Sequence, residues 1–354
     1  MDSLLKSFYK EINIGSQSYF GAALILVKVL GAIIIPFIIQ SIVHELGHLI
    51  FGLLTGYKSW IFRVFNMALV KDKGKYSLKL CSHSEALGQC LMLPLGNTNR
   101  KGELGYSYGL YNLGGVILNF ISGIIFLFLT LELKDISIYS WLFLVFNMLY
   151  GIGFSIINGL PFIENNDGHN YILLNRDYNA QESYNRQLNI FYELYQGKTY
   201  GEIEFKKIKV HNQIDLSNSI ILWHKMMECY YYMDLNRWDR AKGCIEAFRP
   251  FINNLSINDR IFLYLEELYL SIVTKEPSDK IEKLFELTKE FIKKNRSDIN
   301  VYRVETAYKI YKNSRFTIIY DSKVNTNKLE KYSFYKGIRR FTYKQLDTVK
   351  KIYT

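Results

Sequence analysis

Charged residues are almost absent from three long stretches in the first half of the chain. Residues 104–131 and 136–163 contain no Asp, Glu, Lys or Arg, and residues 12–55 contain only Lys28 and Glu45. A helix needs about 20 apolar residues to cross a bilayer, so each stretch is long enough to span one. After the last stretch the chain carries 32 basic and 25 acidic residues. The sequence therefore predicts a membrane-embedded first half and a soluble second half.

The fold class predicted from this pattern is an all-α membrane protein with three or four membrane-spanning helices. After an N-terminal segment (1–19), the spans are expected at about 20–55, 105–131 and 136–160 within a membrane core that covers 20–170. As a single helix the first span would exceed the ~30 Å hydrocarbon core. It therefore tilts, bends near Pro36, or contains two tightly joined passes, and the sequence leaves these alternatives open.

Residues 57–104 alternate apolar and polar side chains, which predicts a short β-rich loop with a turn in Lys71-Asp-Lys-Gly-Lys75. This loop holds eight Lys or Arg residues against three acids, whereas the linker 132–135 holds one lysine. The positive-inside rule then places the loop, and everything after the third span, in the cytoplasm. The expected location is a cell membrane, crossed several times, and the richness in Lys, Ile, Asn and Tyr suggests a bacterial source.

Residues 180–354 show apolar side chains at spacings of three and four, which predicts a helical domain. Three similar segments end at Ile203, Ala241 and Ile281, 38 and 40 residues apart. This spacing is near that of tetratricopeptide repeats. A tetratricopeptide-like repeat and an irregular helical domain both remain possible.

Two histidines and a glutamate interrupt the first apolar stretch in the order His44-Glu-Leu-Gly-His48. Residues i and i+4 of a helix share a face, so both imidazoles can ligate one zinc ion while Glu45 acts as general base. The alternative is a pair of buried histidines that bond to neighbouring helices. An ionisable group at mid-bilayer costs at least ~2.5 kcal/mol and usually has a function, which favours the metal site.

A catalytic zinc ion needs a third protein ligand and an open position. The segment Asn158-Gly-Leu-Pro-Phe-Ile-Glu-Asn-Asn-Asp-Gly-His169 ends the last apolar stretch and offers Asp167. Pro161 can break the helix, so that Asp167 turns back toward the histidines. A plain turn at Asp167-Gly168 is the alternative, and Glu164 is a second candidate ligand.

Together, these motifs resemble the site-2 protease family of intramembrane zinc metalloproteases. The resemblance covers residues 20–170 and rests on HELGH, on Gly114-Gly-Val-Ile-Leu-Asn119, and on Asn158-x-x-Pro161 followed by Asp167-Gly168. It implies one Zn²⁺ per chain, held by the two histidines and Asp167 near the cytoplasmic side, with Glu45 as the catalytic base. The β-rich loop resembles the membrane-associated β segment of that family, which is expected to pair with an unfolded substrate strand.

The chain departs from the family pattern at two points. Asp167 follows Asn158 by nine residues instead of eight, and Ile163 and Asn166 replace a proline and a leucine. The aim of the aspartate is therefore the weakest part of the predicted ligand set.

Asn119 and Asn158 carry amides that could bind a substrate backbone or an oxyanion, although bonding between membrane helices is the alternative role. Gly114 and Gly115 are expected to allow close helix approach. The last 43 residues hold 11 Lys or Arg against three acids. We expect this segment to face the anionic inner leaflet rather than nucleic acid.

The predicted function is hydrolysis of a peptide bond in a membrane-anchored protein or peptide. The expected partners are that substrate, the lipid bilayer and a protein bound by the helical domain. Two alternatives share the site: a membrane adaptor that keeps the metal without proteolysis, and a processing protease for a secreted signalling or antimicrobial peptide. Glu45 argues against the adaptor, since a structural metal site needs only its ligands.

Overall fold

The computed structural model describes residues 18–72, 74–80, 87–94, 108–133, 136–164, 166–210, 215–314, 329–330 and 332–353, together with residues 9 and 13. Within these ranges the chain divides into two compact units. The first contains Met1–Lys79 and Ala86–Asn175, and the second contains Leu80–Glu85 and Arg176–Thr354.

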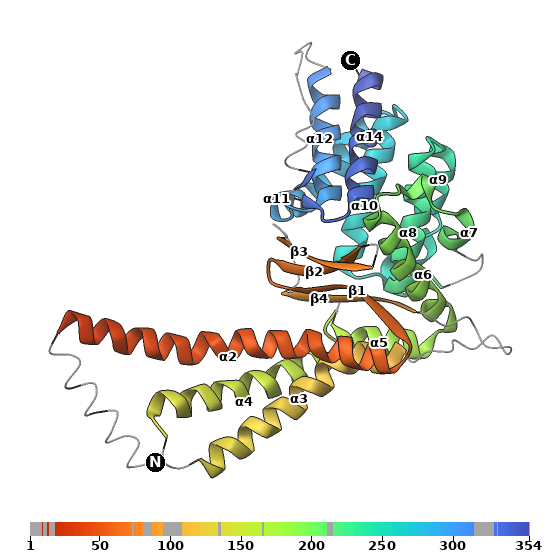
Figure 1. Ribbon diagram of the computed structural model, residues 1–354. Helices are drawn as coiled ribbons and strands as arrows, with labels where there is room; N and C mark the ends of the chain where they lie inside the picture. Colours follow the sequence, from red (N-terminus) through yellow and green to blue (C-terminus); the bar gives the residue numbers. More distant parts are fainter. Residues whose placement is uncertain are drawn as a thin grey trace. The chain divides into compact units, whose positions relative to one another are not determined.

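Three helices of the first unit are long and apolar enough to cross a membrane: α2 (Tyr19–Leu54), α3 (Tyr108–Glu132) and α4 (Ile138–Gly159). They pack against one another (Figure 1). Ser18 and Ser137 cap the N-termini of α2 and α4 by accepting a main-chain N–H bond. The helices match the three predicted stretches, and α2 runs without interruption through Pro36, so two joined passes are not formed there.

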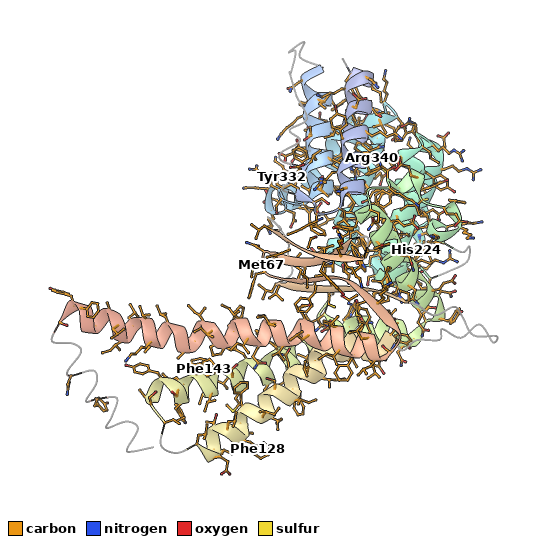
Figure 2. The ribbon with its side chains drawn as sticks, viewed as in Figure 1. Met67, Phe128, Phe143, His224, Tyr332 and Arg340 are labelled. Atoms are coloured by element: carbon orange, nitrogen blue, oxygen red, sulfur yellow. The ribbon has the colours of Figure 1, made fainter. Side chains whose placement is uncertain are left out.

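The polarity of this helical bundle is inverted relative to a water-soluble protein. Apolar side chains such as Leu26 and Phe128 lie on the outside, 58% and 62% exposed (Figure 2). Gln40, Asn119 and Asn147 lie inside and are fully buried. An exterior of this kind suits a hydrocarbon solvent, and it is consistent with membrane association.

Glycine contacts set the spacing between α2 and α3. A Cβ atom at Gly47 would lie 2.2 Å from the carbonyl oxygen of Gly114, so the two backbones touch. A Cβ atom at Gly115 would lie 2.6 Å from the His44 ring. The predicted role of Gly114 and Gly115 in close helix approach is confirmed.

A four-stranded sheet in the order β3-β2-β1-β4 follows α2. Its strands are β1 (Tyr57–Val64), β2 (Met67–Asp72), β3 (Lys75–Leu80) and β4 (Gly88–Pro94). Antiparallel pairing joins β1 to both β2 and β4, with Phe62 opposite Leu69 on one side and Cys90 on the other. Gly74 has a positive φ between β2 and β3, where the turn was expected. The β-rich loop is thus confirmed, and β1 and β4 pack on α2.

The second unit is helical. Its elements are α6 (Tyr178–Tyr195), η1 (Tyr200–Glu202), α7 (Phe205–Ile208), α8 (Ser219–Asp234), α9 (Trp238–Glu246), η2 (Arg249–Asn254), α10 (Ile257–Val273), α11 (Ser278–Lys294), α12 (Ile299–Ser314) and α14 (Lys336–Tyr353). In the chain, the helix α5 (Asp167–Arg176) precedes α6, and all of its residues except Arg176 belong to the first unit.

The helices α6, α8 and α10 end in the same kind of turn. Gly197, Asn236 and Lys275 have positive φ angles, and the next N–H in each turn bonds to the carbonyl five residues back. This is the Schellman arrangement. The three turns stand 39 residues apart, which agrees with the spacing of the repeat seen in the sequence.

Candidate metal centre

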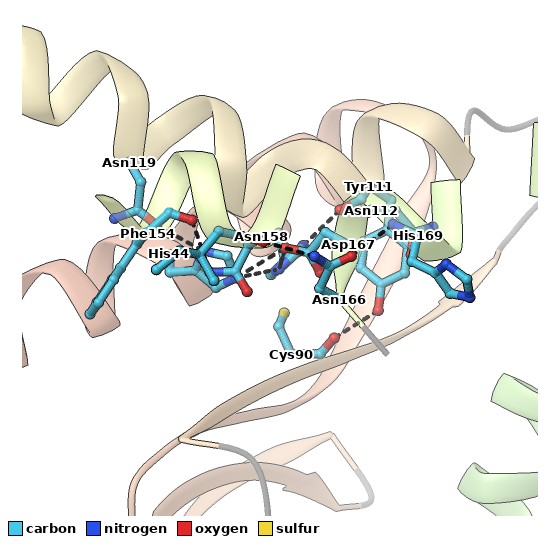
Figure 3. Close-up of polar contacts among 12 residues, drawn as sticks. His44, Cys90, Tyr111, Asn112, Asn119, Phe154, Asn158, Asn166, Asp167 and His169 are labelled. Atoms are coloured by element: carbon cyan, nitrogen blue, oxygen red, sulfur yellow. Dashed lines mark hydrogen bonds and ion pairs between the residues drawn. The ribbon is translucent and has the colours of Figure 1, made fainter. Parts of the chain in front are cut away.

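His44 and His48 lie one turn apart on α2, and their Nε2 atoms approach within 3.2 Å. Figure 3 labels His44 together with Asn119 and Asp167. The Nδ1 atom of His44 donates to Asn119 Oδ1 at 2.8 Å, and that of His48 donates to the Tyr111 carbonyl at 2.8 Å. A carbonyl oxygen only accepts, so each Nδ1 carries the ring proton. Each Nε2 therefore keeps its lone pair for a metal ion.

Asp167 begins α5 and turns toward the same point. Its Oδ2 atom is 3.1 Å from His44 Nε2 and 3.5 Å from His48 Nε2, and within the described part of the chain it makes no hydrogen bond of regular geometry. Three lone pairs at these distances repel one another unless a cation lies between them. The group His44, His48 and Asp167 can therefore hold a metal ion.

The electrostatics of Asp167 fit a cation site. Burial raises the pKa of its carboxyl group, whereas His48 and His44 beside it lower that pKa, and the net result lies below the ordinary value. A metal cation acts in the same direction, so the carboxylate is ionised when it ligates.

Asn166 fixes the direction of Asp167. Its Nδ2 donates to the carbonyls of Ile157 and Leu160 at 2.8 Å each, and its Oδ1 accepts the N–H of His169 at 2.8 Å. One amide thus caps the end of α4 and the start of α5. In the sequence, Asn166 is a departure from the family pattern that weakens the prediction for Asp167. The structure shows that the Asn166 amide holds the longer loop in place. Glu164 is exposed and lies outside the ligand group.

Glu45 lies beside His44 and His48 and is 6% exposed, and among the described residues its Oε2 atom has no hydrogen-bond partner. Strand β4 covers it so closely that a Cβ atom at Gly88 would lie 2.2 Å from Glu45 Oε1. The Tyr111 hydroxyl holds β4 to α3 by donating to the Cys90 carbonyl at 2.7 Å. The carboxylate is therefore confined next to the metal position and keeps one oxygen free.

The two asparagines have different surroundings. Asn119 is fully buried, accepts from His44, and donates to the main-chain carbonyl and to Oε1 of Gln40, each at 3.0 Å. Both ends of its amide are thus engaged by His44 and Gln40, and its predicted contact with substrate stays a prediction. Asn158 is half-buried and donates within its own helix to Phe154 O at 3.0 Å, so its oxyanion role stays a prediction.

No protein-family model, curated protein or solved structure matches the chain. The site rests on its own geometry. Sequence reasoning named the metal-ligating group and Glu45 but missed Gln40, Gly88, Tyr111 and the clamping role of Asn166. Only Gln40 left a sequence signal, since it stands four residues before His44 and shares the helix face of the two histidines.

Proposed function

We propose that the chain is an intramembrane zinc metalloprotease of the site-2 type. The observation that carries the proposal is the triangle of His44 Nε2, His48 Nε2 and Asp167 Oδ2, with sides of 3.1, 3.2 and 3.5 Å, beside Glu45. Ligands that occupy corners of a tetrahedron about 2.0–2.1 Å from zinc lie about 3.3–3.4 Å apart. The two imidazole ligands favour zinc over calcium or magnesium.

The chemistry follows from the groups present. A bound zinc ion would polarise the scissile carbonyl and acidify the attacking water. Glu45 takes the proton from that water as its oxygen adds to the carbonyl carbon, and delivers the proton to the amine as the C–N bond breaks. Its unpartnered Oε2 is the acceptor for this proton.

The surroundings support a membrane-anchored protein or peptide as substrate. The ligands lie on and beside three helices with apolar exteriors. A helical substrate must unwind to expose its scissile carbonyl, and an unwound strand needs hydrogen-bond partners in a bilayer. The sheet beside Glu45 offers such partners through β-strand addition.

We further propose that the sheet and the second unit face the cytoplasm, as the excess of basic residues in 57–104 requires. The helical unit then binds substrate or a protein partner. Part of the basic C-terminal segment is neutralised within that unit, because Arg340 pairs with Glu202 and Lys344 with Asp234. Phe341 of this segment is fully buried, whereas Tyr343 is 49% exposed, and we keep the anionic leaflet as the proposed partner of the remaining basic side chains.

The test compares wild-type protein with Glu45→Gln by membrane proteomics in the cells that produce the chain. The proposal predicts a cleavage product that disappears in the variant while the zinc content stays the same. A wild-type fragment profile in Glu45→Gln would favour the adaptor alternative. Products cut from a soluble secreted peptide alone would favour the processing alternative.

A further inference from the structure

A chain of buried polar side chains runs behind His44, away from the metal position. Gln40 on α2, Asn119 on α3 and Asn147 on α4 are fully buried, and Ser122 on α3 lies beside them. Gln40 Nε2 donates to Ser122 Oγ at 2.9 Å and to Asn147 Oδ1 at 3.3 Å. The group joins all three apolar helices.

The orientation of all three amides is determined, because a main-chain carbonyl fixes the first and the last amide of this hydrogen-bonded series. At one end, Asn147 Nδ2 donates to Phe143 O at 2.9 Å, so Asn147 Oδ1 faces Gln40. At the other end, Asn119 Nδ2 donates to the Gln40 main-chain carbonyl at 3.0 Å. Gln40 Oε1 must then face Asn119 and its Nε2 must face Asn147. No amide can rotate by 180° without placing two donors or two acceptors together.

The fixed amide orientations affect the metal position through His44. Since Asn119 Nδ2 is held by Gln40, Asn119 Oδ1 is the atom that faces His44 Nδ1. An acceptor there requires the proton on Nδ1 and leaves Nε2 as the ligand atom. With Gln40 lacking its amide, Asn119 keeps one bond fewer and its plane is less constrained.

We propose that Gln40 and Asn147 are positioning residues of the metal centre, which act on His44 through Asn119. This inference rests on the zinc site of the proposed function. Gln40, His44 and His48 form an i, i+4, i+8 row on α2, so one helix face carries two ligands and the group that orients one of them.

The competing account is that these residues only hold the helices together, as buried amides do in membranes. The two accounts differ in one measurable way. A positioning role makes the effects of Gln40 and Asn119 overlap, because both act on the same ring nitrogen. A packing role changes protein stability and leaves zinc affinity nearly unaffected.

The experiment measures zinc affinity by chelator competition on full-length protein in detergent, for Gln40→Met, Asn147→Leu, Asn119→Leu and the Gln40→Met/Asn119→Leu double variant. Outer-shell partners of metal-ligating histidines usually account for about 10–100-fold in affinity. We expect Asn119→Leu to lie within this range and Gln40→Met and Asn147→Leu near its lower end. The double variant should bind no more weakly than Asn119→Leu alone.

Ser41→Ala is the matched control, because Ser41 is the buried neighbour of Gln40 and its hydroxyl bonds within its own helix to Phe37 O. This variant should keep wild-type affinity. Visible absorption of the Co²⁺-loaded protein, which reports ligand geometry, should change in Gln40→Met and stay unchanged in Ser41→Ala. If Gln40→Met does not fold, Asn147→Ser, which shortens the acceptor of Gln40, is measured in its place.

The zinc affinities distinguish failure of the proposed function from failure of the positioning role. Failure of the wild-type protein to bind zinc would overturn the proposed function itself. Zinc binding by the wild type together with unchanged affinity in Gln40→Met would overturn this inference alone. Additive losses in the double variant would also overturn it, since they would show that Gln40 acts independently of Asn119.

Discussion

At the scale of single residues, close contacts hold the side chains of the candidate metal centre in place. Glu45 is confined by the backbone of Gly88, and His44 and His48 are each fixed through Nδ1. A general base must lie within hydrogen-bond reach of the proton that it takes. If the proposed function holds, small changes in the neighbours of Glu45 should therefore reduce hydrolysis while the metal-ligating side chains stay in place.

The substitution Gly88→Ala tests this directly. Its Cβ atom would lie 2.2 Å from Glu45 Oε1, so the carboxylate must move. A misplaced catalytic group costs on the order of 100-fold in rate. We expect the cleavage product to fall by about that factor, with unchanged zinc content. Gly153→Ala is the control, because an added Cβ there meets nothing within 4 Å. Equal activity in both variants would contradict the confinement of Glu45.

His224 in the helical unit gives a pH-dependent prediction. Burial, with the positive charges of Arg186 and Lys225, lowers the pKa of His224 from 6.5 to about 4. Below pH 6.5 the unfolded state therefore binds a proton that the folded state does not. The stabilisation is present at neutral pH, is lost as pH falls from 6.5 to 4, and amounts to at most about 3 kcal/mol.

The check is urea unfolding of the full-length protein, with Trp60 and Trp141 changed to Phe so that Trp223 and Trp238 report on the helical unit. The acid-induced loss between pH 6.5 and 4 should be smaller in His224→Gln than in the parent protein. Parallel curves for the two proteins across this range would contradict the lowered pKa.

At the scale of elements, the junction between α4 and α5 determines whether the ligand set is complete. Asn166 bonds to two carbonyls near the end of α4 and to one N–H at the start of α5. The helix boundaries thus place Asp167, the first residue of α5, opposite the two histidines.

The substitution Asn166→Leu should loosen this junction. It removes all three bonds, so Asp167 loses its fixed direction and zinc affinity is expected to fall about 10–100-fold. Chelator competition measures the effect. Asn170→Leu, the same change one turn further along α5, is the control, and it should bind zinc as the wild type does. A zinc affinity in Asn166→Leu that equals the control would show that the loop holds Asp167 without the amide.

The elements differ in how well the sequence predicts them. The three apolar helices and the strands follow from hydrophobic length and alternation, because a long apolar stretch indicates hydrocarbon surroundings and alternation indicates a strand with two different faces. The HELGH ligands follow from helix periodicity. The direction of the Asp167 side chain could not be derived from periodicity, because the direction of a side chain after a helix end depends on capping bonds. The bonds of Asn166 join residues up to nine positions apart in the chain, and no periodicity reveals them.

Most contacts between elements could not be predicted from the sequence. Gln40 reaches Ser122 and Asn147, 82 and 107 residues away. Such partners depend on the register between helices, and the close Gly47–Gly114 contact contributes to the register of α2 and α3. For this reason the sequence identified Asn119 as a candidate site residue but did not reveal its partners. Its amide bonds to His44 and Gln40, on the side of His44 that faces away from the metal position.

At the scale of the whole molecule, the chain combines an apolar helical unit that can hold a metal ion with a separate helical unit. The second unit contains a fully buried ion pair, Arg303 with Glu266, and three equivalent turns at 39-residue spacing. Stacked helical units with such turns are suited to bind a protein segment. Under the proposed function, the chemistry belongs to the first unit and the second unit binds substrate or partner.

The central claim is that His44, His48 and Asp167 hold one zinc ion. Zinc K-edge X-ray absorption on the purified full-length protein measures it most directly. The account predicts one zinc per chain with two imidazole nitrogens and a carboxylate oxygen at about 2.0–2.1 Å, lost in His44→Ala and in Asp167→Ala. Metal-free protein that takes up no zinc when zinc is added would contradict this claim. A zinc coordination shell that neither substitution changes would also contradict it.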